Sequence, residues 1–313
     1  MKRTRIAGMI GGGLALALLM FAGASLSGRL SASDAEDDPD GESVAASLTP
    51  VTFTQVSETR ANGQAMLRLS GVAEPGSTIA LQDRGEPISQ VRTTPQGVWS
   101  AMIDISGPGM AVEAVMSDMG PTDPLEPEAA GVTRIRGVET IFRIQNPAPM
   151  VGENEPARAL IMVGAPGAPT MIVSSPFGGL PAAGPLSIGA VDYDDAGGVI
   201  FSGLSERAGR VRLYASDAAI GETRVGADGR WTYIASSVMP LGTYEVRAEL
   251  LLGDADNPVL SVSFERLPPL PATDSDDGAL SVSFSDDRWQ IRRSLVGGGT
   301  QSTVIFSPER TSE

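Results

Sequence analysis

Residues Ser202 to Trp231 read SGLSERAGRVRLYASDAAIGETRVGADGRW, and they repeat an earlier stretch of the chain without a gap. The earlier stretch, Ser70 to Trp99, reads SGVAEPGSTIALQDRGEPISQVRTTPQGVW. A constant offset of 132 residues separates the two stretches, so that Trp99 aligns with Trp231. Two copies of one unit, spaced a domain length apart, predict tandem domains rather than a solenoid of short repeats.

The second copy alternates apolar and polar residues with a period of two. Val211 and Leu213 stand next to arginines, and residues 244–250 alternate in the same way. This period is typical of strands with one buried and one solvated face. Asp228-Gly229 predicts a type I′ hairpin turn, because glycine accepts positive φ. About seven short strands between residues 186 and 264 predict a β-sandwich of immunoglobulin-like architecture.

The expected fold class is therefore mainly β, with two immunoglobulin-like sandwiches in tandem. They span residues 49–145 and 186–265. Residues 146–185 are dense in Pro, Gly and Ala, which predicts a semi-extended linker. Within it, the apolar piece Ala159–Val163 could pair with a neighbouring strand. Residues 266–278 are expected to form a second, shorter linker.

Composition excludes several classes of function. The net charge of −15 argues against nucleic acid and anionic lipid surfaces as partners. The chain has no Cys and no His, and Lys2 is its only lysine. Nucleophilic catalysis by Ser-His-Asp, Cys-His or Ser-Lys groups therefore has no residues to use, and zinc hydrolases almost always need His or Cys. We expect no enzymatic activity, no cofactor and no metal.

Carboxylates remain as general acid/base groups. Candidates lie in three acidic loops: Asp192, Asp194 and Asp195; Asp254 and Asp256; Asp274, Asp276 and Asp277. Aspartate is favoured in such loops because it caps turns, and this is the expected role. A calcium site of oxygen ligands stays open as an alternative, although no loop has the full twelve-residue spacing.

The amino terminus has the features of an export segment. Lys2, Arg3 and Arg5 precede an uncharged run, Ile6–Gly28. Residues 1–30 are either a signal peptide cleaved near residues 22–24 or an anchor retained in the inner membrane. Both alternatives place the rest of the chain in the periplasm or cell envelope. Residues 31–48 are strongly acidic and are expected to form a disordered tether.

The stretch Leu186–Tyr233, with its VDYD opening, its SG dipeptide and DGRW, resembles the bacterial immunoglobulin-like repeat of exported proteobacterial proteins that end in a LysM module. Residues 279–313 also resemble a LysM module. The matching pieces are a strand LSVSF, the run DDRWQIRR, a glycine turn and the run TQSTVIF. This resemblance implies a small α/β remnant that binds peptidoglycan, with a short helix over Asp287–Leu295.

The LysM resemblance implies that Asp286, Asp287 and Trp289 bind glycan, with Trp289 partly exposed on the helix. Arg288 and Arg292 depart from the family, because they stand where it buries apolar or small residues. We therefore expect a truncated, degenerate module that binds glycan weakly or not at all by itself.

Trp99 and Trp231 have two possible roles. Aromatic side chains can stack on sugars, but the identical place of both residues in the repeat favours a core role. The expected function is a non-enzymatic binding and spacer protein of the cell envelope, associated with peptidoglycan through its tail. The alternative is a surface adhesion or envelope-assembly protein that binds other proteins through its sandwiches.

Overall fold

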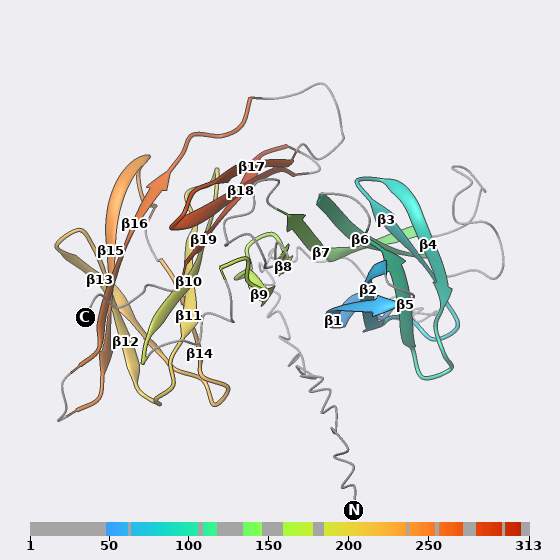
Figure 1. The fold of residues 1–313 in the computed structure, drawn as a ribbon, viewed down its shortest axis with the longest axis horizontal. Helices are drawn as coiled ribbons and strands as arrows, with labels where there is room; N and C mark the ends of the chain where they lie inside the picture. Colours follow the sequence, from blue (N-terminus) through green and yellow to red (C-terminus); the bar gives the residue numbers. More distant parts are fainter. Residues whose placement is uncertain are drawn as a thin grey trace, which may run out of the picture.

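The computed structural model describes residues 48–61, 64–105, 109–117, 134–145, 159–177, 185–235, 238–253, 257–271, 280–295 and 298–307. The described residues form strands β1 to β19 and no helix, so the chain is mainly β (Figure 1). The strands make four antiparallel sheets. The export segment 1–30, and all but the last residue of the acidic tether, lie outside the described residues.

The first sandwich packs a three-stranded sheet against a larger one. The three-stranded sheet has the order β1 (Thr52–Ala61), β2 (Gln64–Val72), β5 (Val98–Asp104). The facing sheet begins with β4 (Glu86–Arg92), β3 (Thr78–Asp83), β6 (Gly109–Ser117) and β7 (Arg134–Gln145). Buried side chains of both sheets form one core, among them Leu69, Trp99, Ile79 and Met116. Alternation along each strand places these residues on the inner faces.

The second sandwich repeats this strand order. Its first sheet contains β10 (Ser187–Asp194), β11 (Val199–Leu204) and β14 (Arg230–Ile234). The facing sheet has the order β13 (Ala218–Arg224), β12 (Arg210–Ala215), β15 (Gly242–Leu251), β16 (Val259–Arg266). Its core includes Phe201, Leu213, Trp231 and Phe264. The internal repeat of the sequence therefore corresponds to two sandwiches of seven equivalent strands.

The same glycine–tryptophan contact fixes both copies. A Cβ atom on Gly71 would lie 1.9 Å from the Thr52 carbonyl oxygen and 2.6 Å from the Trp99 ring. On Gly203 it would lie 1.9 Å from the Ser187 carbonyl oxygen and 2.6 Å from the Trp231 ring. Both tryptophans are buried, 1% and 2% exposed, so each occupies the core of its sandwich.

The turn before Trp231 is not the predicted type I′ hairpin. Gly229 has a φ of 77°, but Asp228 does not have a positive φ, and β13 and β14 belong to different sheets. The Gly229 amide donates to the Gly226 carbonyl, 3.0 Å, and the chain then crosses to the facing sheet. The prediction failed because a glycine in the sequence indicates a positive φ at that position. It does not indicate which strand will pair with the strand that follows.

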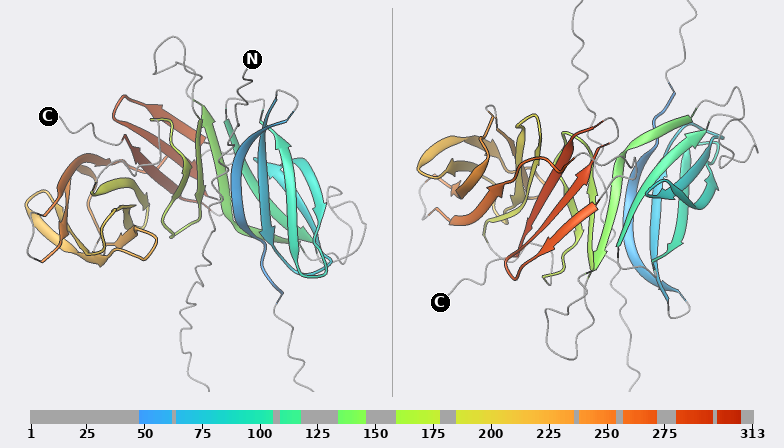
Figure 2. Two further views of the ribbon diagram at one scale, coloured as in Figure 1. Left: turned by 60° about the horizontal axis from the view of Figure 1, so that its bottom comes forward. Right: turned by 90° about the horizontal axis from the view of Figure 1, so that it is seen from above.

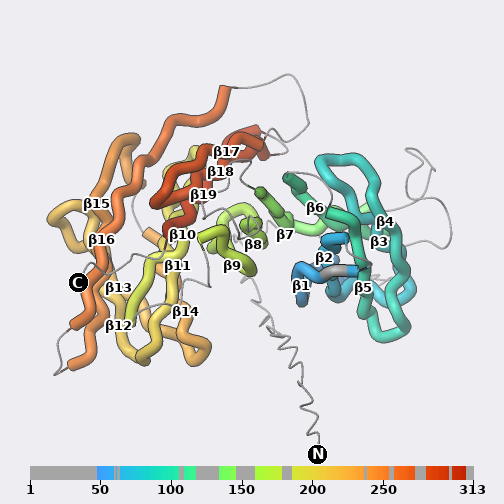
Figure 3. Tube along the Cα trace, in the orientation of Figure 1, coloured from blue at the N-terminus to red at the C-terminus, as the bar shows by residue number. Residues whose placement is uncertain are grey.

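Five further strands extend the sandwiches toward each other. β8 (Ala159–Gly164) pairs with β7 and then with β9 (Met171–Ser174). β19 (Thr300–Phe306) pairs with β10 and then with β18 (Arg288–Ser294), which pairs with β17 (Leu280–Phe284). Figure 3 follows the chain from the first sandwich through β8 and β9 into β10.

These extensions create a third core between the sandwiches. Its buried members come from the outer faces of both six-stranded sheets and include Phe142, Leu160, Met162, Trp289, Ile291 and Ile305. Strand β19 serves two cores, because Ile305 enters the third core while Val304 and Phe306 enter that of the second sandwich. The described residues therefore form a stack of four sheets that encloses three cores in succession (Figure 2).

Two sequence-based expectations are corrected here. Residues 146–185 were expected to be a linker, yet they contain β8 and β9. The pairing considered for the apolar run Ala159–Val163 is confirmed, and its partner is β7. The expected helix over Asp287–Leu295 is wrong, because these residues include strand β18 and no α/β LysM remnant is present among the described residues. Trp289 and Ile291 are buried and their neighbours are less so, which is a period of two.

Candidate functional site at the junction of the sandwiches

Residues 279–313, which were expected to form a glycan-binding tail, contribute Trp289, Ile291 and Ile305 to the third core. Trp289 is 1% exposed, and its ring makes edge-to-face contacts with Phe284 and Phe177, with centroids 4.8 and 5.9 Å away. Asp286 and Asp287 are exposed in the turn between β17 and β18, where Asp287 accepts a hydrogen bond from the Ser285 hydroxyl. The three predicted residues therefore do not form one surface, and Trp289 is not available to stack on a sugar.

The two arginines that depart from the LysM pattern hold β18 against the second sandwich. The Arg288 guanidinium donates to the carbonyl of Ser263 on β16, and Arg292 donates to the carbonyl of Pro268. Neither cation is buried without a partner, because the strand directs both to backbone oxygens near the surface. Trp289 and Ile291 point from the opposite face of β18 into the third core.

A buried carboxylate lies at the edge of this core. Asp192, on β10, is 2% exposed. It accepts hydrogen bonds from the Thr170 amide at 2.7 Å, the Thr170 hydroxyl at 2.6 Å and the Thr303 hydroxyl at 2.6 Å. Burial raises the pKa of Asp192, and these hydrogen bonds together with the charge of Arg293 oppose the rise. Asp192 thus connects the turn after β8 with β10 and β19.

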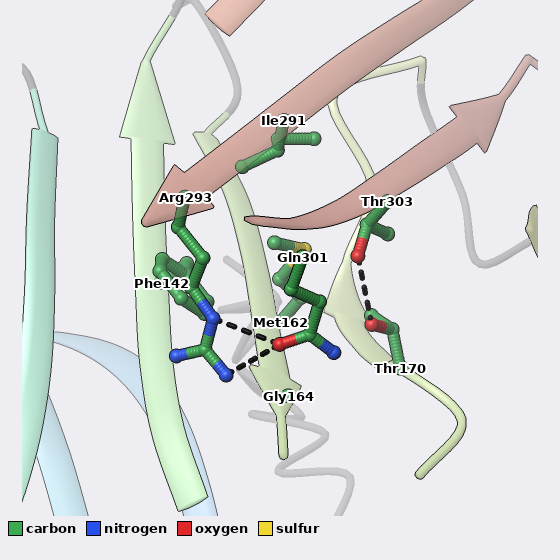
Figure 4. A pocket seen from close by; sticks show the side chains of 8 residues that line it. All are labelled: Phe142, Met162, Gly164, Thr170, Ile291, Arg293, Gln301 and Thr303. Atoms are coloured by element: carbon green, nitrogen blue, oxygen red, sulfur yellow. Dashed lines mark hydrogen bonds between the residues drawn. The ribbon is translucent and has the colours of Figure 1, made fainter. Parts of the chain in front are cut away.

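Arg293 is the cation of the same junction. Its guanidinium donates twice to the Gln301 side-chain oxygen, 2.8 and 2.6 Å (Figure 4). It also donates once to the Thr140 hydroxyl, 2.8 Å. Burial lowers the pKa of Arg293, whereas Glu113 and Asp192 raise it. Gln301 in turn donates to the carbonyl of Ala165. The polar groups thus link β7 and the β8–β9 turn to β18 and β19.

The side chains of the junction leave little space between them. The cavity beside Arg293 has a volume of about 10 Å³, which is close to the space needed by one water molecule. In the described part of the chain, no group of three or more His, Cys, Asp or Glu side chains is placed to hold a metal ion.

A separate open groove lies beside β16 and has a volume of about 230 Å³. It is lined by Thr243, Ser263, Glu265, Arg288, Gln290 and Val304.

Asp194 and Asp195 both accept hydrogen bonds from backbone amides. Asp194 accepts a hydrogen bond from the Gly198 amide, 3.1 Å, and Asp195 accepts one from the Thr300 amide, 2.6 Å. The Asp194 contact stabilises its own turn, as aspartate commonly does in loops. The Asp195 contact instead ties this loop to the start of β19. The other candidates, Asp254, Asp256, Asp274, Asp276 and Asp277, lie outside the described residues.

The contacts of the junction were not predicted from the sequence. Asp192 was expected in an acidic loop, with a turn role and a calcium site as the alternatives, whereas the structure places it inside strand β10 next to buried Val191. An aspartate inside a strand, where this residue type is depleted, was the available signal.

Comparison with known proteins gives no family assignment. No family model matches the chain, and no curated protein matches it. Among solved structures, the chain is similar to a Ca²⁺-stabilized adhesin with which an Antarctic bacterium reaches out and binds ice. The identity is 12%, the TM-score is 0.21, and the match covers 78% of this chain and 86% of the adhesin chain. None of the described residues forms a helix long and apolar enough to cross a bilayer.

Proposed function

We propose that this protein is exported to the bacterial cell envelope, where it acts without catalysis as a stiff spacer that binds other envelope proteins through its sheet edges. The observation that carries this proposal is the third core, which joins the two sandwiches through buried side chains of both. Burying a large apolar side chain contributes about 1.5–3 kcal/mol. Because opening the junction would expose several of them, the separation of the two outer sheets is fixed.

The outer strands supply the binding groups. In the first sandwich β4 and β5 are edge strands, and in the second β13 and β14 are their equivalents. Ile88 on β4 is 39% exposed, and Met102 on β5 is 49% exposed. Exposed edges with apolar side chains can add a strand from another protein. Export is supported by the basic start and long uncharged run of residues 1–30.

Export is tested with a reporter that is active only in the periplasm, fused after Glu42. The proposal expects activity of the reporter, and an inactive fusion found in the soluble cytoplasm would contradict it. Protein binding is tested by crosslinking in cells followed by affinity capture. Ile88→Lys should reduce capture of the partner, whereas Leu241→Lys, on an exposed apolar residue that belongs to no strand, should not. Sedimentation of the chain with purified peptidoglycan, in the absence of protein partners, would instead favour glycan binding.

A further inference from the structure

The pentapeptide LSVSF occurs twice, at residues 260–264 and 280–284. The first copy lies in β16 and the second is the whole of β17. Each strand is the last one of its sheet, so each has one unpaired edge. In Figure 1, β17 lies at the outer margin of its sheet, beyond β18. Identical sequences at two free edges allow a direct comparison of how each edge is protected.

In β16, the backbone amides and carbonyls of the two serines point away from β15, toward the free edge. Pro258 accepts a hydrogen bond from Leu250 of β15, so the alternation of antiparallel bonding directs Leu260, Val262 and Phe264 toward β15. The outward carbonyls are then those of Ser263 and Glu265. Ser263 accepts from Arg288, and Glu265 accepts from the Tyr193 hydroxyl. Side chains of neighbouring strands therefore cap this edge.

The backbone of β17 has the opposite phase. The Ser285 amide donates to Arg288 across the turn, 2.9 Å, so Ser283 and Ser281 bond to β18. The amides and carbonyls of Leu280, Val282 and Phe284 therefore face outward. Among the described residues none bonds to these outward groups, and the strand carries no charge, no proline and no bulge. These are the features with which proteins usually block pairing at an edge.

We propose that two copies of this chain associate through β17, which pairs antiparallel with β17 of the second copy about a two-fold axis at Val282. The sequence LSVSF is nearly palindromic, and its centre coincides with an outward-facing backbone position. Val282 then meets Val282 of the partner, Leu280 meets Phe284, and the serines meet each other. A contact in which one patch meets itself is what a closed dimer requires. The six-stranded sheet that contains β17 in one copy then continues into the same sheet of the second copy.

The side chains favour this pairing. Phe284 is 36% exposed although its ring contacts Trp289, and Leu280 of the second copy would cover the remaining face. Aromatic–aliphatic pairs across antiparallel strands contribute about 0.2–1 kcal/mol each. The net charge of −15 per copy opposes association, and Asp286 and Asp287 lie just beyond the C-terminal end of β17. Salt screens this repulsion, so the dimer should be stronger at high ionic strength.

The test uses the full chain, purified in a mild non-ionic detergent because of its long apolar run. Light scattering over a concentration series at low and high salt should show a monomer–dimer equilibrium. Val282→Pro removes an outward amide without removing a bond to β18, and it should raise the dimer Kd about tenfold or more. Because Val282 also packs against the third core, the melting temperature should fall somewhat, and circular dichroism should show that the strand content is retained. If that variant does not fold, Ser281→Lys with Ser283→Lys should weaken the dimer by charge repulsion at exposed positions.

Disulfide trapping supplies an independent measurement, because the chain contains no cysteine. Val282→Cys should form a crosslinked dimer on mild oxidation, since the two Cα atoms in such a pair are about 5.5 Å apart. Val262→Cys, the same pentapeptide position in β16, is the matched control and should not crosslink. A chain that stays monomeric at all concentrations and salts would overturn the proposal. So would equal crosslinking at positions 262 and 282, or undiminished association of the proline variant.

Discussion

Gly71 leaves no space for a side chain, because the Thr52 carbonyl and the Trp99 ring occupy the position of a Cβ atom. We therefore expect Gly71→Ala to displace the tryptophan and to destabilise the first sandwich by about 1–3 kcal/mol, as overpacking of a core does. Denaturant unfolding monitored by tryptophan fluorescence measures this change. Gly109→Ala is the matched control, since its nearest neighbour would lie 3.8 Å from the new atom. Equal costs for both substitutions would contradict the assigned contact.

Asp192 is expected to make the junction less stable as the pH rises. Its pKa in the folded protein is raised by burial, so over a range above the ordinary value of about 4 the folded state binds more protons than the unfolded state. The stability that the protonated carboxyl confers is therefore fully present below the ordinary value of about 4, and it is lost as the pH rises from there through the raised pKa. Thermal unfolding measured from mildly acidic to neutral pH should show a falling melting temperature.

Two variants separate this effect from other titrating groups, such as Glu139, whose pKa burial also raises. Asp192→Asn keeps the shape of the side chain and should flatten the pH dependence. Thr303→Val removes one hydrogen-bond donor to the carboxylate, 2.6 Å away, and should make the dependence steeper. An unchanged slope in the Asn variant would show that Asp192 does not titrate in this range.

At the scale of elements, the internal repeat was sufficient to predict the seven-stranded units. Alternating burial and turn residues are local properties, and they could be read along residues 202–231 without knowledge of the partners. The same alternation was present in RWQIR at 288–292, but the family resemblance favoured a helix there. The repeated LSVSF pentapeptide was a further signal that residues 280–284 form a strand like that at 260–264.

The pairings that make the third core could not be predicted in this way. β10 bonds to β19, so that Asp192 pairs with Thr303 across more than a hundred residues of chain. The local sequence of neither strand indicates that the other is its partner. An alternation with a period of two predicts which side chains face the core, but it does not predict which strand lies alongside. For the same reason the polar contacts of Asp192 and Arg293, which depend on these pairings, were absent from the sequence-based predictions.

The C-terminal strands are expected to fold only on the rest of the molecule. A peptide of residues 279–313 contains β17–β19, but Trp289 and Ile305 bury themselves against β7, β8 and β10. So short a chain without disulfide or metal has too little core to be stable alone. Circular dichroism of the isolated peptide should show an unfolded chain. The peptide should gain strand structure on mixing with residues 1–278, and a peptide that folds alone would contradict this dependence.

At the scale of the whole molecule, each core contains one of the three tryptophans. Trp99 lies in the first sandwich, Trp289 in the junction and Trp231 in the second sandwich. Each six-stranded sheet contributes side chains to two neighbouring cores. The two sandwiches should therefore unfold in one cooperative transition rather than as independent domains. The stability effects of distant substitutions add only when the two sites are not coupled. Here the junction couples the two sandwiches, so substitutions in one should affect the unfolding of the other.

Trp289→Ala should therefore have a different effect from Trp231→Ala. Each substitution removes a large buried side chain and should cost about 3–5 kcal/mol. Loss of Trp231 weakens the second sandwich and, through the intact junction, lowers one common unfolding transition. Loss of Trp289 opens the junction itself, so calorimetry should resolve two transitions, and small-angle scattering of the folded variant should show a larger radius than the wild type. Trp289→Phe, which keeps an aromatic side chain against Phe284, should retain a single transition. A wild-type protein that already unfolds in two separate steps would refute the coupling.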